Sequence, residues 1–175
     1  MVGMRWGAVL GALGLAFGLS VPSASAAVPA KRLKVCSVVL PAELEPIFER
    51  TYRKGIADDA GACNYRKQDV PANLKKDDIV VSVIPERFGS PKRAKQAFAK
   101  QRSTVTELAG APPEAVPVGD GAFYTLFIGT DLLTMRVGRV VVDVRVENND
   151  DDQAVYHDQA IAVGQAIATR LATAP

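Results

Sequence analysis

The clearest pattern in the sequence is an alternation of apolar and polar residues that ends in the valine-rich segment 140–148. Valines occupy every even position from Val140 to Val146. A period of two places alternate side chains on opposite faces of a β-strand. A two-residue loop at 138–139 would pair position 137 with 140 and position 133 with 144. The pattern therefore predicts an antiparallel meander of three strands between residues 121 and 148, with one buried face.

The first turn of this meander decides which side chains lie on its second face. Gly129 and Thr130 are the expected loop, because glycine is common in hairpin turns. This loop puts Tyr124 on the same face as Leu133. The large apolar residues left on the opposite face are Phe123, Phe127 and Leu132. We expect the helices to cover part of that face, and an apolar ligand to occupy whatever they leave open.

Two amphipathic helices are predicted near the ends of the domain. The first begins at Pro41, a residue favoured at the first helical position, continues with apolar residues every four positions, and ends at Gly55. Pro46 lies inside this range, so the helix either kinks there or starts near Glu45. The last helix has apolar residues at spacings of three and four over 156–171. Three aspartates at 150–152 precede it, where negative charge is favoured.

Two further strands are predicted before the meander. Residues 63–67 form a short one, and the apolar run at 79–84 is typical of a strand buried on both faces, closed by Pro85. With a helix starting at Ser90-Pro91, the order is α-β-β-α-β-β-β-α. We therefore expect an α+β fold, with a twisted antiparallel sheet of about five strands and helices packed on it.

The helix that starts at Ser90-Pro91 is strongly basic on its polar side. Its cations are Lys92, Arg93, Lys95, Lys100 and Arg102. Five positive charges with no acid among them are suited to an anionic envelope polymer or a lipid headgroup. The competing interpretation is a solvated face with no partner, and the sequence leaves both open.

The N-terminus has the three regions of a signal peptide. Arg5 precedes a long apolar run, and Ala24-Ser25-Ala26 is a small-residue cleavage site. The apolar run is shorter than the roughly 20 residues that span a bilayer, so cleavage after Ala26 is favoured over a retained anchor. We expect residues 1–26 to be a signal peptide and residues 27–175 to be a single secreted α+β domain, extracellular or at the cell envelope.

The charge balance of the expected mature chain excludes a general attraction to polyanions. Of 21 Lys and Arg and 19 Asp and Glu, only Arg5 lies within residues 1–26, which leaves a net charge of +1. Binding to nucleic acid without sequence preference requires a clustered surplus of cations. We therefore expect no nucleic-acid partner, at most peripheral membrane contact, and a monomer.

The two cysteines are expected to form a disulfide. Cys36 and Cys63 are the only cysteines in the chain, and the chain is predicted to enter an oxidising compartment. A metal site or a reactive thiol fits less well, because neither cysteine has a neighbouring histidine or a second ligand pair.

Short motifs resemble a family of actinobacterial cell-envelope domains, secreted or lipid-anchored, mostly of unknown function and in part related to extracellular sensor domains. The matching segments are Cys36-Ser37, Leu40-Pro41-Ala42-Glu43-Leu44, Gly61-Ala62-Cys63-Asn64-Tyr65 and the stretch from Val116 to Phe123. The resemblance implies an extracytoplasmic α+β fold with a bridge from Cys36 to Cys63, and it transfers no catalytic residue. The lipid-attachment cysteine of many members has no counterpart here.

No segment of the sequence carries a catalytic, metal or cofactor signature. His157 is the only histidine, and no sequence neighbour nominates a nucleophile for it, so a solvated or capping role is favoured. The aspartates at 150–152 lack the alternating ligands and glycine of a calcium loop. Gly119-Asp120-Gly121 precedes a strand rather than a helix, so a turn is favoured over a phosphate loop.

These observations favour a non-enzymatic module of the secreted or envelope class. Its ligand would be an apolar or amphiphilic molecule, or a partner protein, and no cofactor or metal is expected. The alternative is a structural or interaction protein that uses its basic helix on anionic surfaces. A hydrolase is the least favoured class.

Overall fold

The computed structural model describes residues 33–68, 79–127, 129–148 and 155–173. The predicted signal peptide and the aspartates at 150–152 lie outside these ranges. The elements are η1 (Val35–Ser37), α1 (Pro41–Phe48), β1 (Ile56–Ala57), β2 (Cys63–Tyr65), β3 (Ile79–Arg87), α2 (Pro91–Ala109), β4 (Glu114–Val116), β5 (Ala122–Phe127), β6 (Thr130–Val137), β7 (Val140–Asn148) and α3 (His157–Thr173). The chain is α+β, as predicted.

All seven described strands join one antiparallel sheet in the order β1-β2-β3-β7-β6-β5-β4. The sheet consists of two meanders, β1 to β3 and β4 to β7, which meet where β3 pairs with β7 over nine residue pairs. The prediction of about five strands and its element order were wrong in detail. Both missed strands, β1 and β4, are short edge strands of two and three residues, too short for a periodic pattern to appear.

The predicted register of the last hairpin is confirmed. Val137 lies opposite Val140 and Leu133 opposite Val144. The preceding hairpin closes one residue earlier than predicted, because Phe127 pairs with Thr130 and Tyr124 pairs with Leu133. That change shifts the pairing by two positions, which preserves the predicted faces, since alternate residues share a face.

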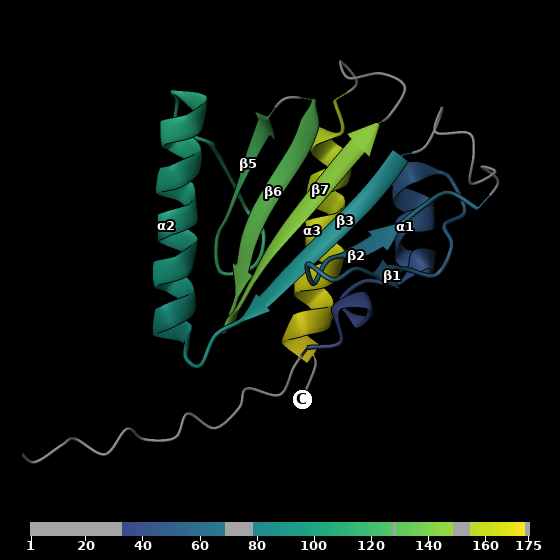
Figure 1. The fold of residues 1–175 in the computed structure, drawn as a ribbon, viewed down its shortest axis with the longest axis horizontal. Coiled ribbons are helices and arrows are strands. Elements are labelled where there is room, and N and C mark those ends of the chain that lie inside the picture. The colour runs from purple at the N-terminus through teal and green to yellow at the C-terminus, as the bar shows by residue number, and fades with distance from the viewer. Residues whose placement is uncertain (1–32, 69–78, 128, 149–154, 174–175) are drawn as a thin grey trace, which may run out of the picture.

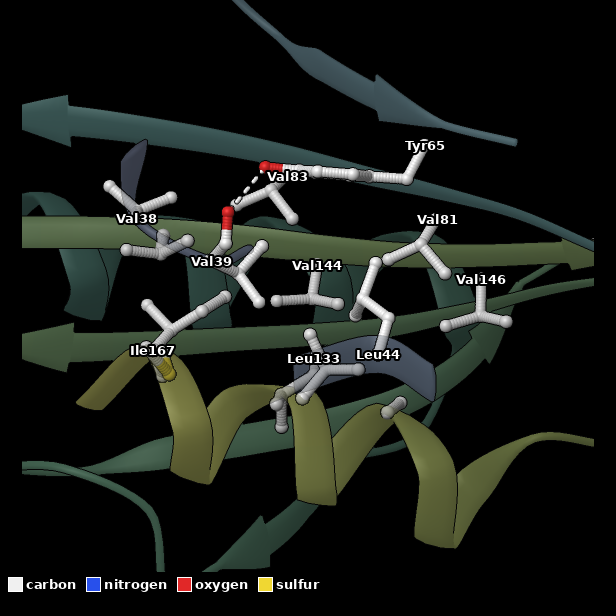
Figure 2. Close-up of a cluster of buried hydrophobic side chains, with 14 of the residues drawn as sticks. Val38, Val39, Leu44, Tyr65, Val81, Val83, Leu133, Val144, Val146 and Ile167 are labelled. Atoms are coloured by element: carbon white, nitrogen blue, oxygen red, sulfur yellow. Dashed lines mark hydrogen bonds between the residues drawn. The ribbon is translucent and has the colours of Figure 1, made fainter. Parts of the chain in front are cut away.

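Two layers of helix cover the two faces of the sheet. The valine face packs against α3, α1 and η1, and Figure 1 shows α3 passing behind the central strands. Figure 2 shows how Leu44 from α1 and Ile167 from α3 meet Val144 and Leu133 of the sheet, all fully buried. Among the described helices, α2 is the one that lies on the second face, where it contacts β5, β6 and β7. One face is therefore a dry core, and the other is covered in part.

Several predicted boundaries needed correction, and the strand predicted at 63–67 ends at Tyr65. Helix α1 ends at Phe48, where Glu49 adopts a left-handed conformation, and does not reach Gly55. Strand β3 continues past Pro85 to Arg87, and its even positions Val80 and Ile84 are only half-buried. The run of apolar residues at 79–84 therefore has one buried face rather than two.

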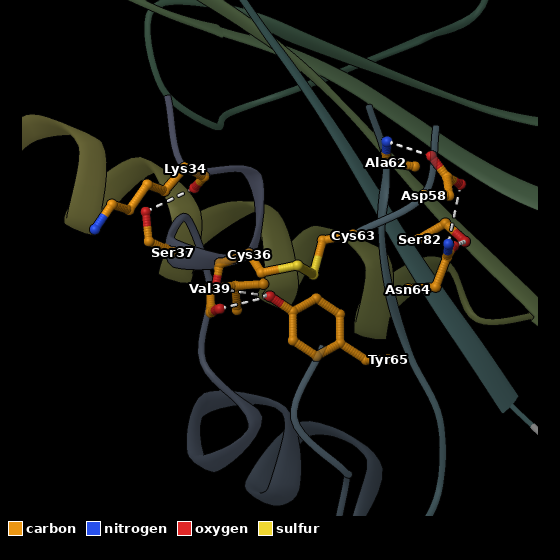
Figure 3. The surroundings of a disulfide bond; sticks show 10 residues. All are labelled: Lys34, Cys36, Ser37, Val39, Asp58, Ala62, Cys63, Asn64, Tyr65 and Ser82. Atoms are coloured by element: carbon orange, nitrogen blue, oxygen red, sulfur yellow. Dashed lines mark hydrogen bonds between the residues drawn. A yellow bond between two sulfur atoms is a disulfide. The ribbon is translucent and has the colours of Figure 1, made fainter. Parts of the chain in front are cut away.

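The cysteines are bonded as predicted. Cys36 in η1 is joined to Cys63 in β2, with 5.1 Å between the Cα atoms (Figure 3). Beside the bridge, Oη of Tyr65 donates a hydrogen bond of 2.7 Å to the carbonyl of Val39, and burial raises the pKa of Tyr65 to about 12. The bridge and this hydrogen bond hold the N-terminal segment against the sheet.

Helix α3 approaches the sheet closely at a single glycine. A Cβ placed on Gly164 would overlap the side chain of Leu133 and would lie 3.3 Å from Val118 and 3.4 Å from Met135. Ala160, Val163 and Ile167 on the same side of the helix are fully buried, as its periodicity predicts. The absence of a side chain at this position sets the distance between helix and sheet.

Candidate functional site

Helix α2 lies on the second face of the sheet with little of its own surface buried. The hydroxyl of Ser90 caps its N-terminus by accepting a hydrogen bond from the backbone of Arg93, as predicted. Ala94 is the one buried residue of this 19-residue helix. The main aromatic contact is Phe98 against Phe123, with ring centroids 5.3 Å apart. The other residues of α2 are exposed or only partly buried.

A groove of about 330 Å³ opens between α2 and the sheet. We call it the α2 groove, and its lining residues are Glu86, Phe88, Ala97, Lys100, Gln101, Thr104, Val105, Leu132, Thr134 and Asp143. Leu132, Thr134 and Asp143 project from β6 and β7 on the face opposite the valine core. The volume lies at the lower end of the range of small-molecule sites, and such sites combine apolar walls with a few polar groups.

The polar part of the α2 groove consists of three hydrogen-bonded side chains: Thr134 from β6, Asp143 from β7 and Gln101 from α2. Oγ1 of Thr134 donates to one carboxylate oxygen of Asp143 at 2.7 Å, and Nε2 of Gln101 lies 3.3 Å from the other. The side-chain oxygen Oε1 of Gln101 is buried, and no described residue donates a hydrogen bond to it. Gln101 therefore has a buried side-chain acceptor that the described part of the chain leaves unsatisfied and that solvent does not reach.

The environment of Asp143 strengthens this polar character. Burial raises the pKa of the Asp143 carboxyl above its ordinary value, while the hydrogen bond from Thr134 and the charge of Arg145 oppose that rise. Removing a carboxylate from water is costly unless donors or a cation compensate. A donor or cation brought into the groove would therefore be stabilised beside this carboxylate.

The three residues predicted to form an apolar ligand face do share the second face of the sheet, but they have different surroundings. Phe123 is fully buried beneath α2. Phe127, at the end of β5, is 40% exposed and does not line the α2 groove. Leu132 is half-buried and lies in the groove wall. Of the three, Leu132 therefore lines the groove, and Phe123 packs against α2.

The five cations of α2 lie on its outer side. We call them the basic face, and Lys92, Arg93, Lys95, Lys100 and Arg102 are all exposed. None of them forms an ion pair with an acidic residue of the described ranges. Lys100 also borders the α2 groove. The arrangement is compatible both with a solvated face and with an anionic surface as partner.

His157 lies at the start of α3 among polar and aromatic neighbours. Its Nδ1 is 2.8 Å from Asp158, its Nε2 is 3.2 Å from Glu114, and its ring packs edge-on against Tyr124 at 4.5 Å. The hydrogen bond to Asp158 and, to a smaller degree, Glu114 raise the pKa of His157 above 6.5, against the effect of burial. No serine or cysteine contacts the ring among the described interactions, so the geometry supplies acidic partners without a nucleophile.

The carboxylate of Asp131, which contacts Tyr124, is structural. Asp131 is fully buried, accepts a hydrogen bond from the hydroxyl of Tyr124, and accepts another of 3.0 Å from the backbone N–H of Tyr156. It therefore caps the N-terminus of α3 from a strand, a role that usually falls to a residue of the helix itself. Burial and the hydrogen bond to Asp131 raise the pKa of the Tyr124 hydroxyl.

The Gly119-Asp120-Gly121 segment is a turn, as predicted. Asp120 forms an ion pair of 3.0 Å with Arg136 and accepts a hydrogen bond from the backbone of Gly138. A Cβ at Gly119 would lie 2.6 Å from the carbonyl oxygen of Arg136. The segment clamps the β6–β7 hairpin and presents no phosphate site.

Sequence reasoning missed the polar members of the α2 groove, although signals for them were present. Gln101 interrupts the apolar side of α2 between Phe98 and Val105. The register predicted for the last hairpin already places Thr134 opposite Asp143, and this pairing is observed. Thr134 and Asp143 face each other on the side of the sheet that α2 covers, and Gln101 lies on the inner side of that helix. Together these positions indicate a buried polar cluster.

Within the described residues, no helix has the length and hydrophobicity needed to cross a bilayer, and no three His, Cys, Asp or Glu residues converge as metal ligands. Comparison of the chain with family models, with curated proteins and with solved structures finds no match.

Proposed function

We propose that this protein is a secreted binding module that holds the apolar part of a small amphiphilic ligand in the α2 groove. One observation supports this above the others: the groove passes between a loosely seated helix and a sheet face, and its wall combines Leu132, Ala97 and Val105 with a few polar groups. A sheet face that existed only to carry a helix would bury that helix more completely. No catalytic step is assigned to the site.

The experiment is a calorimetric titration with 1-octanol, a neutral amphiphile with an eight-carbon tail. The parent is expected to bind saturably, because burial of apolar surface contributes about 25 cal/mol per Å². Ala97→Met, which fills the groove from the helix side, should weaken binding at least tenfold, and Leu132→Asp should abolish it. Leu126→Asp is the matched control, since Leu126 is 48% exposed on the other face of the sheet.

The outcomes separate clearly. Binding that is lost in both groove variants and kept in the control supports the proposal, provided that the unfolding midpoints of the variants stay close to that of the parent. Equal binding by parent and Ala97→Met would place the ligand elsewhere and end the proposal.

A second function is supported by the exposure of the basic face. Association with an anionic surface would use all five cations, and it would weaken steeply as salt rises, because screening reaches about 10 Å at 0.1 M. Replacing Lys92, Arg93 and Lys95 with Gln should abolish co-sedimentation with anionic liposomes at low salt, without lowering the unfolding midpoint.

The matched control for this test removes three exposed positive charges from the N-terminal part of the chain, away from α2. Those residues are Lys34, Lys54 and Arg66. If the α2 variant and the control lose binding equally, net charge alone is responsible. If the parent fails to bind at low salt, the basic face is only solvated.

A further inference from the structure

The inference concerns His157, and it is independent of the α2 groove. His157 begins α3 and is the single histidine of the chain. Its Nδ1 lies 2.8 Å from a carboxylate oxygen of Asp158, and its Nε2 lies 3.2 Å from a carboxylate oxygen of Glu114 in β4. Each nitrogen of the ring therefore faces a carboxylate.

This arrangement requires two protons on the ring. An ionised carboxylate only accepts hydrogen bonds, so each contact needs an N–H on the ring nitrogen. A neutral imidazole has one N–H and one lone pair, whereas the imidazolium has two N–H groups. In a neutral ring, one nitrogen lone pair would face a carboxylate oxygen at hydrogen-bonding distance, which is repulsive. The geometry is therefore that of a protonated histidine.

The charged and titratable groups described around the ring come from β4, β5 and α3. Among the described residues, neither Glu114 nor Asp158 forms an ion pair with a Lys or Arg. The hydrogen bond to Asp158 and, by less, Glu114 raise the pKa of His157, while burial opposes the rise. Burial and the hydrogen bond to Asp131 of β6 raise the pKa of the Tyr124 hydroxyl, so it stays neutral while the histidine titrates.

The contact with Glu114 links α3 to an edge of the sheet. Strand β4 is the outer strand at this edge, and its three residues cover part of the edge of β5. Val116 is buried in the core, whereas Glu114 and Ala115 are exposed. Loss of the contact would loosen the pairing of Glu114 with Tyr124 and make backbone groups of β5 accessible there.

We propose that His157 is a pH-sensitive clasp for this edge of the sheet: its protonated ring joins β4 to α3, and its neutral ring keeps the proton on Nδ1 and releases Glu114. Nδ1 keeps the proton because its contact is the shorter one and Asp158 is the next residue of the same helix. The edge-on contact with the ring of Tyr124, with centroids 4.5 Å apart, hinders rotation of the imidazole. Since the pKa of His157 is raised, the clasp is closed at low pH and opens as pH rises through that pKa.

The test is amide hydrogen exchange of the full protein by NMR, at one pH below the titration midpoint of His157 and one above it. Protection factors remove the intrinsic pH dependence of exchange. Amides along β4 and its partner residues in β5 should be several-fold better protected below the midpoint, and those of the central strand β7 should not change. The effect is local because the Glu114 side chain is 57% exposed, and exposed ion pairs contribute little to global stability.

A second measurement reads the ring directly. The ¹⁵N chemical shifts of the imidazole distinguish the imidazolium from the two neutral tautomers. We expect the imidazolium at low pH and the neutral ring with its proton on Nδ1 at high pH. A neutral ring with its proton on Nε2 would still donate to Glu114, and that result would overturn the proposal.

The decisive variant is Glu114→Gln, because an amide can accept from a protonated ring nitrogen and donate to a bare one. In this variant β4 should be equally protected on both sides of the midpoint. Asp158→Asn is the matched control: it removes the other carboxylate, so the change in β4 should remain and move to lower pH. Equal protection of β4 in the parent at both pH values, or a change that persists in Glu114→Gln, would show that His157 is not a clasp.

Discussion

Breaking the bridge between Cys36 and Cys63 should destabilise the protein without unfolding it. The two cysteines are 27 residues apart, and closing a loop of that size removes about 3.5 kcal/mol of conformational entropy from the unfolded chain. For a protein of this size each kcal/mol shifts the melting temperature by about 2–4 °C, so the midpoint should fall by roughly 7–14 °C. The hydrogen bond from Tyr65 to Val39 does not involve the sulfur atoms, so we expect it to persist in the reduced form and to hold the segment after η1 near the sheet.

The assay is thermal unfolding, monitored by circular dichroism, with and without reductant. A double variant, Cys36→Ala with Cys63→Ala, should melt near the midpoint of the reduced parent and should not respond to reductant. Hydrogen exchange should show the largest loss of protection in η1, α1 and β2, the segments that the bridge joins. Equal midpoints for the oxidised and reduced parent, with the oxidised state verified by mass, would refute the reasoning.

Two further predictions concern packing and titration. Gly164→Ala should cost about 1–3 kcal/mol of unfolding free energy in a denaturant titration, because the added methyl overlaps the sheet, whereas Gly89→Ala, with no neighbour nearer than 3.9 Å, should cost much less. His157, the single histidine, should titrate by NMR above pH 6.5, lower in Asp158→Asn and, by less, in Glu114→Gln. Since its folded pKa is raised, its stabilising contribution should be present at low pH and lost as pH rises through that pKa. Titration at or below the ordinary value, or equal costs for the two glycine variants, would contradict these expectations.

The core was predictable because its periodicities are strong. The valines of β7 and the stripe of α3 face each other as the sequence indicates, and Val144 and Ile167 are both fully buried. The edge strands β1 and β4 were not predictable, since their pairing depends on backbone groups of neighbours rather than on a side-chain pattern. Likewise, the cap of α3 is Asp131, distant in sequence, which no local signal identifies.

For the α2 groove, the sequence predicted the face of the sheet on which it lies but not the residues that line it. Alternation in the meander placed Phe123, Phe127 and Leu132 together, but it did not indicate which of them the helix would cover. That outcome depends on where α2 contacts the sheet, at Ala94 and Phe98, and a contact of this kind is tertiary. The polar groups of the groove, Gln101, Thr134 and Asp143, were not predicted as a site. Each residue is common on a protein surface, and only their contacts in the folded chain show that they form one cluster.

Direct observation of where an amphiphile binds tests the central proposal most closely. Backbone and side-chain amide resonances of ¹⁵N-labelled protein should be followed during titration with 1-octanol. We predict saturable shifts at Ala97, Gln101, Leu132 and Asp143, with little change along α3 and the valine face. Shifts confined to the exposed residues Leu126 and Val155, or the absence of saturable shifts at the groove residues, would contradict a ligand site in the α2 groove.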